Sequence, residues 1–196
     1  LLGGKSRPPF IPGLPIADMT AGLFSAFGIL AGLLARERTG RGQQIDIPMT
    51  DCMLSFNTPN VAHHLALQRD PHRSLHEGTL SWGQDVPWRN VYETQDGRYL
   101  CFANLEEKFW ANLCRVIGRP ELAEEHDTSE ERGRQITEEL RALLRTKTQA
   151  EWLALLEGQD ICFSPVHPME EVLSDPHLVH REMFSEIEHP VEGRLL

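Results

Sequence analysis

The longest apolar stretch of the chain lies near its start, between Met19 and Ala35, where no charged residue occurs. Small residues recur through it at helical spacing: Ala21, Gly22, Ala26, Gly28, Ala31 and Gly32. Glycine inside a helix costs up to about 1 kcal/mol relative to alanine, so three glycines indicate the close approach of another backbone. The Gly28–Gly32 spacing also occurs in membrane helix dimers. However, the stretch is shorter than the usual ~20-residue span. We predict a buried helix of a soluble α/β core.

A turn, a strand and a second helix are predicted to follow. Residues 39–42 supply a helix stop and a turn. Residues 44–49 alternate apolar and polar, and Pro48 places this predicted strand at the edge or end of a sheet. Thr50 or Asp51 would cap a helix that continues through Leu65. This order of elements is typical of a parallel sheet flanked by helices, the α/β class.

The apolar pattern is lost between residues 69 and 88 and then resumes as a second unit. Two short strands flank Asp96-Gly97, a strong hairpin signal. Asn104 and Glu107 have the spacing of a helix-capping pair, and Thr148 and Glu151 have the same spacing before a later helix. Further predictions are a solvated acidic run at 121–131, a helix lined by Ile136, Leu140, Leu143 and Leu144, a strand at 161–166 and a short helix opening at Asp175-Pro176.

Composition narrows the class of protein. The net charge of −10 argues against binding to nucleic acid or to an anionic membrane. The four cysteines lack paired spacing, which suits a reducing compartment, and residues 1–7 lack a secretory pattern. We therefore expect a cytoplasmic protein. The chain opens without methionine and runs into several prolines, as a piece of a longer protein would.

Two acidic residues stand at predicted helix starts, Asp18 and Glu106. A carboxylate at a helix start can cap free N–H groups for about 0.5–2 kcal/mol, or it can serve chemistry there. From spacing alone the cap is the simpler interpretation. The nine histidines form no metal-binding pattern, so no metal site is expected. No Gly-x-Ser-x-Gly motif occurs either. The residues by themselves define no reaction.

Short motifs are spread along the chain: Ile16-Ala17-Asp18 before the glycine-rich helix, Glu37-Arg38-Thr39-Gly40-Arg41-Gly42-Gln43, Asp46-Ile47-Pro48-Met49-Thr50-Asp51, Asp96-Gly97-Arg98-Tyr99, Leu105-Glu106-Glu107-Lys108-Phe109-Trp110, Gly118-Arg119-Pro120-Glu121-Leu122, Ser164-Pro165-Val166 and Asp175-Pro176-His177. Through these motifs the chain resembles, over nearly its full length, the family III CoA-transferase and α-methylacyl-CoA racemase family. This resemblance implies that Asp18 is catalytic. In the transferases the matching aspartate is a nucleophile that forms acyl-anhydride and aspartyl-CoA intermediates. In the racemases it pairs with a histidine, and the two exchange the α-proton of a 2-methylacyl-CoA.

The resemblance also implies a role for Glu106. Racemases carry a glutamate at the matching place, where it approaches the catalytic histidine across a dimer interface. Glu107 departs from the proline common there, and residues 80–84 hold one glycine where many transferases have a glycine-rich segment. The resemblance therefore favours an α-methylacyl-CoA racemase. A CoA-transferase and a non-catalytic binding or assembly domain are the alternatives.

The implied organisation places residues 1–70 in a large CoA-transferase-type domain, 71–90 in a linker, 91–178 in a small α+β domain and 179–196 in the return to the large domain. The family's N-terminal half, with most CoA contacts and the racemase histidine, has no counterpart here. We therefore expect residues 1–196 alone to be inactive. The implied partners are an acyl-CoA, as substrate, and a second copy in an interlocked homodimer. No cofactor is expected.

Overall fold

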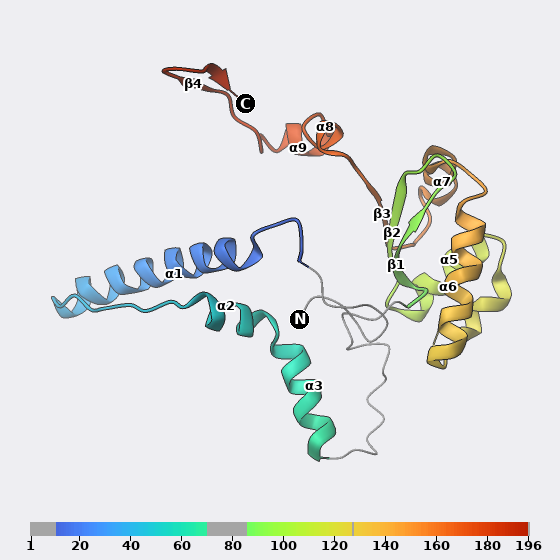
Figure 1. Cartoon of the computed structure of the whole chain (residues 1–196), viewed down its shortest axis with the longest axis horizontal. Coiled ribbons are helices and arrows are strands. Elements are labelled where there is room, and N and C mark those ends of the chain that lie inside the picture. Colours follow the sequence, from blue (N-terminus) through green and yellow to red (C-terminus); the bar gives the residue numbers. More distant parts are fainter. Residues whose placement is uncertain (1–10, 70–85, 127, 196) are drawn as a thin grey trace. The chain divides into compact units, whose positions relative to one another are not determined.

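The computed structural model describes residues 11–69, 86–126 and 128–195 (Figure 1). Helices and antiparallel strands make up two compact units, Leu1–Val86 and Pro87–Leu196. The division falls inside the stretch predicted as a linker. His72, His76 and the segment at 80–84 lie outside the described residues. The predicted domain limits therefore stay predictions, and each unit is described by itself.

The first unit consists of helices joined by an extended segment. Helix α1 spans Ile16–Thr39 and ends at Gly40, whose φ of 69° is left-handed and whose N–H donates to the Arg36 carbonyl. The chain then runs extended to α2 (Met49–Phe56) and α3 (Thr58–Arg69). Residues 44–48 pair with no other strand among the described residues, so the predicted strand was wrong. Pro48 is the N-cap of α2, so the cap predicted at Thr50 or Asp51 was wrong. The single helix predicted to continue through Leu65 is divided at Asn57 into α2 and α3.

The glycines of α1 accommodate side chains of the extended segment. A Cβ atom added at Gly28 would lie 2.7 Å from Ile47 Cδ1, and one added at Gly32 would lie 2.7 Å from Ile45 Cδ1. The close approach predicted from the glycines is therefore made by two isoleucines rather than by another backbone. Apart from these contacts α1 is largely exposed, and Thr20 is its one buried residue. The prediction of a buried helix was thus wrong for the described residues.

Helix α1 is also the one helix among the described residues that is long and apolar enough to cross a membrane by length and composition. A mostly buried core helix of a soluble protein and a signal sequence near an N-terminus pass the same test, so the test is weak evidence for a membrane span. The isoleucines that fill the space over Gly28 and Gly32 show that one face of α1 packs against protein.

The second unit is built on a three-stranded antiparallel sheet in the order β1-β2-β3. The strands are β1 (Arg89–Glu93), β2 (Tyr99–Ala103) and β3 (Phe163–Val166), with Val91 opposite Cys101 and Cys101 opposite Ser164. The hairpin at Asp96-Gly97 is confirmed, and Gly97 has a φ of 73°. The strand predicted at 161–166 is confirmed from residue 163.

Helices cover one face of this sheet (Figure 1). They are α5 (Glu107–Val116), the 3₁₀ helix η1 (Pro120–Glu125), α6 (Glu130–Leu144) and α7 (Gln149–Leu156). The predicted capping box of α7 is confirmed: Thr148 accepts from the Glu151 N–H, and Glu151 accepts from the Thr148 N–H. The core between helices and sheet contains Tyr92, Leu100, Phe102, Trp110, Leu113, Leu122, Ile136, Leu140, Leu144, Trp152 and Leu156.

Asp96 connects the hairpin turn to the start of α7. Its carboxylate accepts from the Thr94 hydroxyl at 2.6 Å and from the Gln149 N–H at 3.2 Å. The Gln149 side chain donates to the Tyr99 carbonyl at 2.7 Å, and the Gln95 N–H donates to the Lys147 carbonyl at 2.9 Å. A turn and a helix separated by about fifty residues in the sequence are therefore hydrogen-bonded as one piece.

The described residues of the acidic run at 121–131 lie at the surface as predicted, apart from the buried Leu122, and several of their carboxylates are paired with arginines. Arg132 donates to Glu125 at 2.5 and 2.8 Å and to Glu139 at 3.0 Å. Arg119 donates to Glu121 and Glu139, both at 2.5 Å. These ion pairs fasten η1 to α6.

The last part of the chain consists of short elements. They are α8 (Met169–Val172), α9 (Pro176–His180), and the antiparallel pair β4 (Ile187–His189) and β5 (Gly193–Leu195). As predicted, Asp175 opens α9, and its side chain accepts from the N–H groups of His177 and Leu178.

Candidate active-site carboxylates

Asp18 lies in the first turn of α1 with its side chain exposed. Pro15 occupies the N-cap position, and among the described residues no donor contacts the Asp18 carboxylate. The capping interpretation therefore finds no hydrogen bond in its support. What the local structure provides is a free carboxylate beside the N-terminal N–H groups of a 24-residue helix, where negative charge is favoured.

Glu106 occupies the N-cap position of α5, with extended backbone angles of −89° and 139°. Its carbonyl oxygen accepts from the N–H groups of Phe109 at 3.0 Å and Trp110 at 3.2 Å. The side chain is exposed, and no donor among the described residues contacts its carboxylate. The predicted capping pair of Asn104 and Glu107 was wrong, because Asn104 lies outside the helix and its side chain accepts from the Cys162 N–H instead.

The two carboxylates belong to different units, Asp18 to the first and Glu106 to the second. Each is exposed on a well-defined helix start. Whether they meet, within one chain or between two, stays a prediction.

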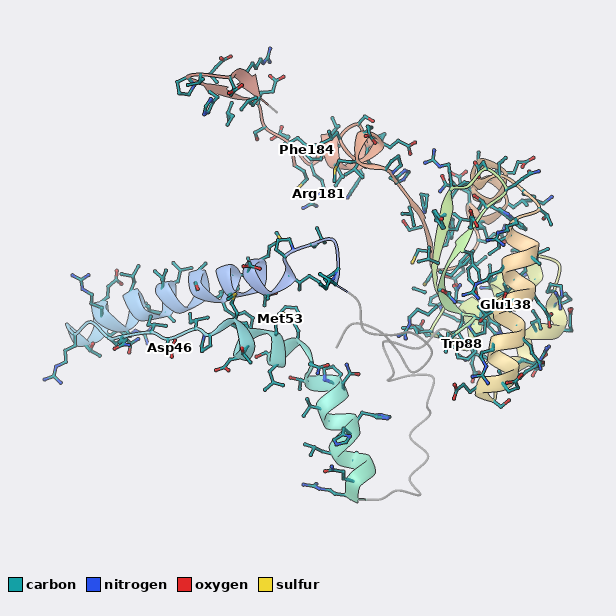
Figure 2. All side chains as sticks on the ribbon, viewed as in Figure 1. Asp46, Met53, Trp88, Glu138, Arg181 and Phe184 are labelled. Carbon is teal, nitrogen blue, oxygen red and sulfur yellow. The ribbon has the colours of Figure 1, made fainter. Side chains whose placement is uncertain are left out.

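Among the histidines of the described residues, His64, His126 and His167 contact side chains or backbone of other residue types. No group of three or more His, Cys, Asp or Glu side chains suited to a metal ion occurs within residues 11–69, 86–126 and 128–195. His64 lies 3.0 Å from the Gln68 amide, and His167 lies 2.8 Å from Glu171. His126 stacks on Trp88, whose position at the entry to the second unit is visible in Figure 2.

The most strongly perturbed groups of the second unit are held in structural contacts. Hydrogen bonds from Arg98 and then His167 lower the pKa of the Glu171 carboxyl to about 2. Burial raises the pKa of the Cys114 thiol to about 12, which keeps this thiol protonated and unreactive. The sequence analysis missed the Arg98–Glu171–His167 cluster, because 73 residues separate Arg98 from Glu171.

The profile of CoA-transferase family III matches residues 1–196. The chain belongs to CoA-transferase family III. This family III chain is 28% identical to mouse succinyl-CoA:glutarate CoA-transferase, over 100% of the chain and 44% of that enzyme. It is 31% identical to the succinyl-CoA:mesaconate CoA-transferase of Haloarcula marismortui, over 97% of the chain and 47% of that enzyme. It is 29% identical to an Escherichia coli formyl-CoA:oxalate CoA-transferase, over 96% of the chain and 50% of that enzyme.

Solved structures support the same fold. A crystal structure of Rv3272 from Mycobacterium tuberculosis superimposes with a TM-score of 0.70 at 24% identity, covering 100% of the family III chain and 51% of Rv3272. A second crystal structure of Rv3272 gives a TM-score of 0.64 at 26% identity, over 95% of the chain and 49% of Rv3272. The predicted family and fold class are therefore confirmed. The chain spans about half the length of the curated relatives it matches.

The named relatives bear on the choice between the family's two reactions. All three are CoA-transferases. The racemase interpretation, which the sequence analysis preferred, gains no specific support from them, whereas its alternative does.

Proposed function

We propose that the protein containing residues 1–196 is a CoA-transferase that moves CoA between two carboxylic acids, with Asp18 as the nucleophile. The observation that carries this proposal is the free carboxylate of Asp18 in the first turn of α1, in a chain whose relatives are CoA-transferases. An aspartate tied to an arginine or to backbone N–H groups would be a weaker nucleophile, because those contacts stabilise its charge.

The proposed reaction proceeds by exchange of acyl groups at Asp18. A carboxylate oxygen of Asp18 attacks the thioester carbonyl carbon, the carbon–sulfur bond breaks, and CoA leaves as a thiolate while an acyl–aspartyl anhydride forms. The thiolate then attacks the aspartyl carbonyl carbon, which releases the donor acid and leaves an aspartyl-CoA thioester. Attack by the acceptor carboxylate reverses these steps and forms the new acyl-CoA. The N–H groups at the start of α1 would stabilise the negative charge that develops on the carbonyl oxygen as each carbonyl carbon near Asp18 is attacked.

The test traps the intermediate. A longer protein containing this chain would be incubated with succinyl-CoA, treated with hydroxylamine and digested for mass spectrometry. Hydroxamate is expected at Asp18 and absent in the Asp18→Asn variant. Asp51→Asn is the matched control, since Asp51 is likewise an exposed aspartate in the first turn of a helix. Unchanged trapping in Asp18→Asn would reject Asp18 as the nucleophile.

The relatives' names suggest which acids to assay first. Glutarate and mesaconate with succinyl-CoA, and oxalate with formyl-CoA, are the pairs that the relatives use. Transfer to any of these acceptors would define the substrate class as short dicarboxylates.

A second candidate is the α-methylacyl-CoA racemase reaction, favoured by the Glu106 motif and the free Glu106 carboxylate. It requires two acid–base groups, one on each face of the α-carbon, each contributing about 10²–10⁴-fold. Deuterium incorporation at the α-carbon of a 2-methylacyl-CoA, lost in Asp18→Asn, would establish it. Residues 1–196 alone should bind acyl-CoA weakly and leave its configuration unchanged. Absence of both deuterium incorporation and trapping would favour a non-catalytic domain.

In either reaction we propose that Glu106 reaches the Asp18 region of a neighbouring chain in a homodimer. Both residues stand exposed on the surface of their own units, which leaves them available for such a contact. Mixed dimers of Asp18→Cys and Glu106→Cys chains, each with its own tag, should form an intermolecular disulfide on mild oxidation. A disulfide within a doubly substituted chain, and none between chains, would contradict the proposal.

A further inference from the structure

Asn104 is a polar residue that is 0% exposed and lies two positions before Glu106. It is hydrogen-bonded to three separate parts of the second unit. Its N–H donates to the Trp88 carbonyl at 2.8 Å, and its side-chain oxygen accepts from the Cys162 N–H at 2.8 Å. Its carbonyl oxygen lies 3.2 Å from Nε2 of His126. The chain before β1, after η1 and before β3 is thereby joined at this one residue.

His126 is itself held in place by aromatic rings. Its ring centroid lies 4.6 Å from that of Trp88 and 6.5 Å from that of Trp110. Trp110 belongs to α5 and is fixed in the core, with its indole N–H donating to the Leu122 carbonyl at 2.7 Å. The hydrogen bond from His126 therefore connects Asn104 to a part of the unit that has little freedom to move.

The backbone of Glu106 is thus fixed from both sides. The hydrogen bonds of Asn104 hold the backbone before Glu106. After Glu106, the N–H groups of the first turn of α5 donate to its carbonyl oxygen, while its carboxylate remains free. Two other glutamates of the same unit, Glu125 and Glu139, differ from Glu106 because both are paired with Arg132. A fixed backbone at Glu106 supplies one part of the positioning that a preorganised site requires.

Packing alone does not account for an asparagine at this position. Its side-chain N–H₂ is buried and has no hydrogen-bond partner among the described residues. A buried donor without a partner destabilises the folded state. Its side-chain oxygen does accept a hydrogen bond, from the Cys162 N–H, two positions before Glu106 in the chain.

We propose that Asn104 and His126 are positioning residues that set the place of the Glu106 carboxylate. This inference rests on the proposed function, in which Glu106 belongs to the site. A displacement of about 1 Å in a reacting group can cost about 100-fold in rate. Loosening the Asn104–His126 hydrogen bond should therefore reduce turnover without removing Glu106 itself.

The experiment uses the longer protein with two opposed substitutions at position 126. His126→Phe keeps an aromatic ring against Trp88 but removes the N–H donor to Asn104. His126→Gln keeps an N–H donor and removes the ring. With succinyl-CoA and the best dicarboxylate acceptor, we expect His126→Phe to lower kcat about tenfold with KM within about twofold, and His126→Gln to recover most of the loss. Added to Glu106→Gln, His126→Phe should cause no further loss, because both changes act through one group.

A structural readout separates this inference from the proposed function. Hydrogen exchange at the amides of residues 105–107 should speed up about tenfold in His126→Phe and in Asn104→Ala, and stay near the parent rate in His126→Gln. Unchanged exchange, losses that multiply in the double variant, or full kcat in Glu106→Gln would each overturn the positioning role. Failure of the proposed function appears elsewhere, as absence of hydroxamate at Asp18.

Discussion

The two units differ in where their apolar side chains lie. In the second unit Trp110, Trp152 and Leu140 are buried between helices and sheet. In the first unit the described residues bury Thr20 and Cys52, while α1 exposes a helical stripe made by Leu23, Phe27, Leu30 and Leu34. The second unit therefore carries a core of its own. Within residues 11–69, the first unit is a set of well-formed helices that pack mainly through the contacts of α1 with the extended segment and with α2.

The secondary structure of the two units is therefore stabilised in different ways. The helices and strands of the second unit are stabilised by burial against one another, which supplies most of the free energy of folding. Helix α1 is held by its own hydrogen bonds, by the two isoleucines over its glycines and by α2, where Phe24 and Phe56 meet edge to face with ring centroids 6.4 Å apart. In proteins most of the stability of a helix comes from tertiary packing of its apolar face. Asp18 thus belongs to the unit with little buried core, and Glu106 belongs to the unit that has a core of its own.

The largest expected effect comes from separating the units. Residues 87–196 should unfold in one cooperative transition, because their buried side chains form a continuous core. Residues 1–69 should lose helicity gradually on heating. Circular dichroism against temperature measures both. A sharp transition in residues 1–69 would show that the first unit has a stability the exposed stripe does not suggest.

Matched leucine substitutions sharpen the comparison. Leu140→Ala removes a side chain that is 1% exposed and should destabilise the second unit by about 2–5 kcal/mol. Leu30→Ala removes one that is 64% exposed and should change the stability of the chain by about 0.5 kcal/mol or less. Urea unfolding gives both values. Comparable losses would mean that Leu30 is covered in solution.

The glycines of α1 provide a smaller contrast. Gly22→Ala should stabilise the helix by up to about 1 kcal/mol, since nothing lies within 4 Å of the added Cβ. Gly32→Ala should gain less, because its Cβ would lie 2.7 Å from Ile45 Cδ1 and the isoleucine must move. Hydrogen exchange along α1 compares the two variants. Equal protection in both would indicate that the extended segment does not stay on the helix.

The smallest effect concerns acid. The folded-state pKa of Glu171, about 2, lies below its ordinary value of 4.5, so its pair with Arg98 stabilises the folded state above about pH 4.5. That contribution is lost as the pH falls toward 2. Glu171→Gln should therefore lower the unfolding temperature of residues 87–196 at pH 7 and approach the parent near pH 2. Glu170→Gln is the control, since no cation contacts Glu170 among the described residues. A pH-independent difference would show that the pair is not responsible.

The sequence predicted the second unit better than the first for a physical reason. The hairpin at Asp96-Gly97 and the capping box at Thr148 depend on residues a few positions apart, and both are confirmed. The strand at 44–49 was wrong because alternation cannot tell pairing with a strand from packing on a helix, which is what Ile45 and Ile47 do. The Asn104 cap was wrong because its true partner, Cys162, lies 58 residues away.

For the candidate site, the sequence correctly placed Asp18 and Glu106 at helix starts. It also named the family, through motifs spread over the whole chain. It did not find Asn104 and His126, because their importance depends on contacts that only folding creates. The motif around Glu106 could not decide between the racemase and transferase reactions, because one glutamate does not define a reaction.

The hydrogen bonds of Asp96 have a consequence for how the second unit opens. The amides of Gln95 and Gln149 lie on either side of one junction, where the first donates to the Lys147 carbonyl and the second to Asp96. Exchange of either amide with solvent requires its hydrogen bond across this junction to open. The hairpin turn and the start of α7 should therefore open together. Proteolysis in the turn or at the start of α7 should depend on that same local opening.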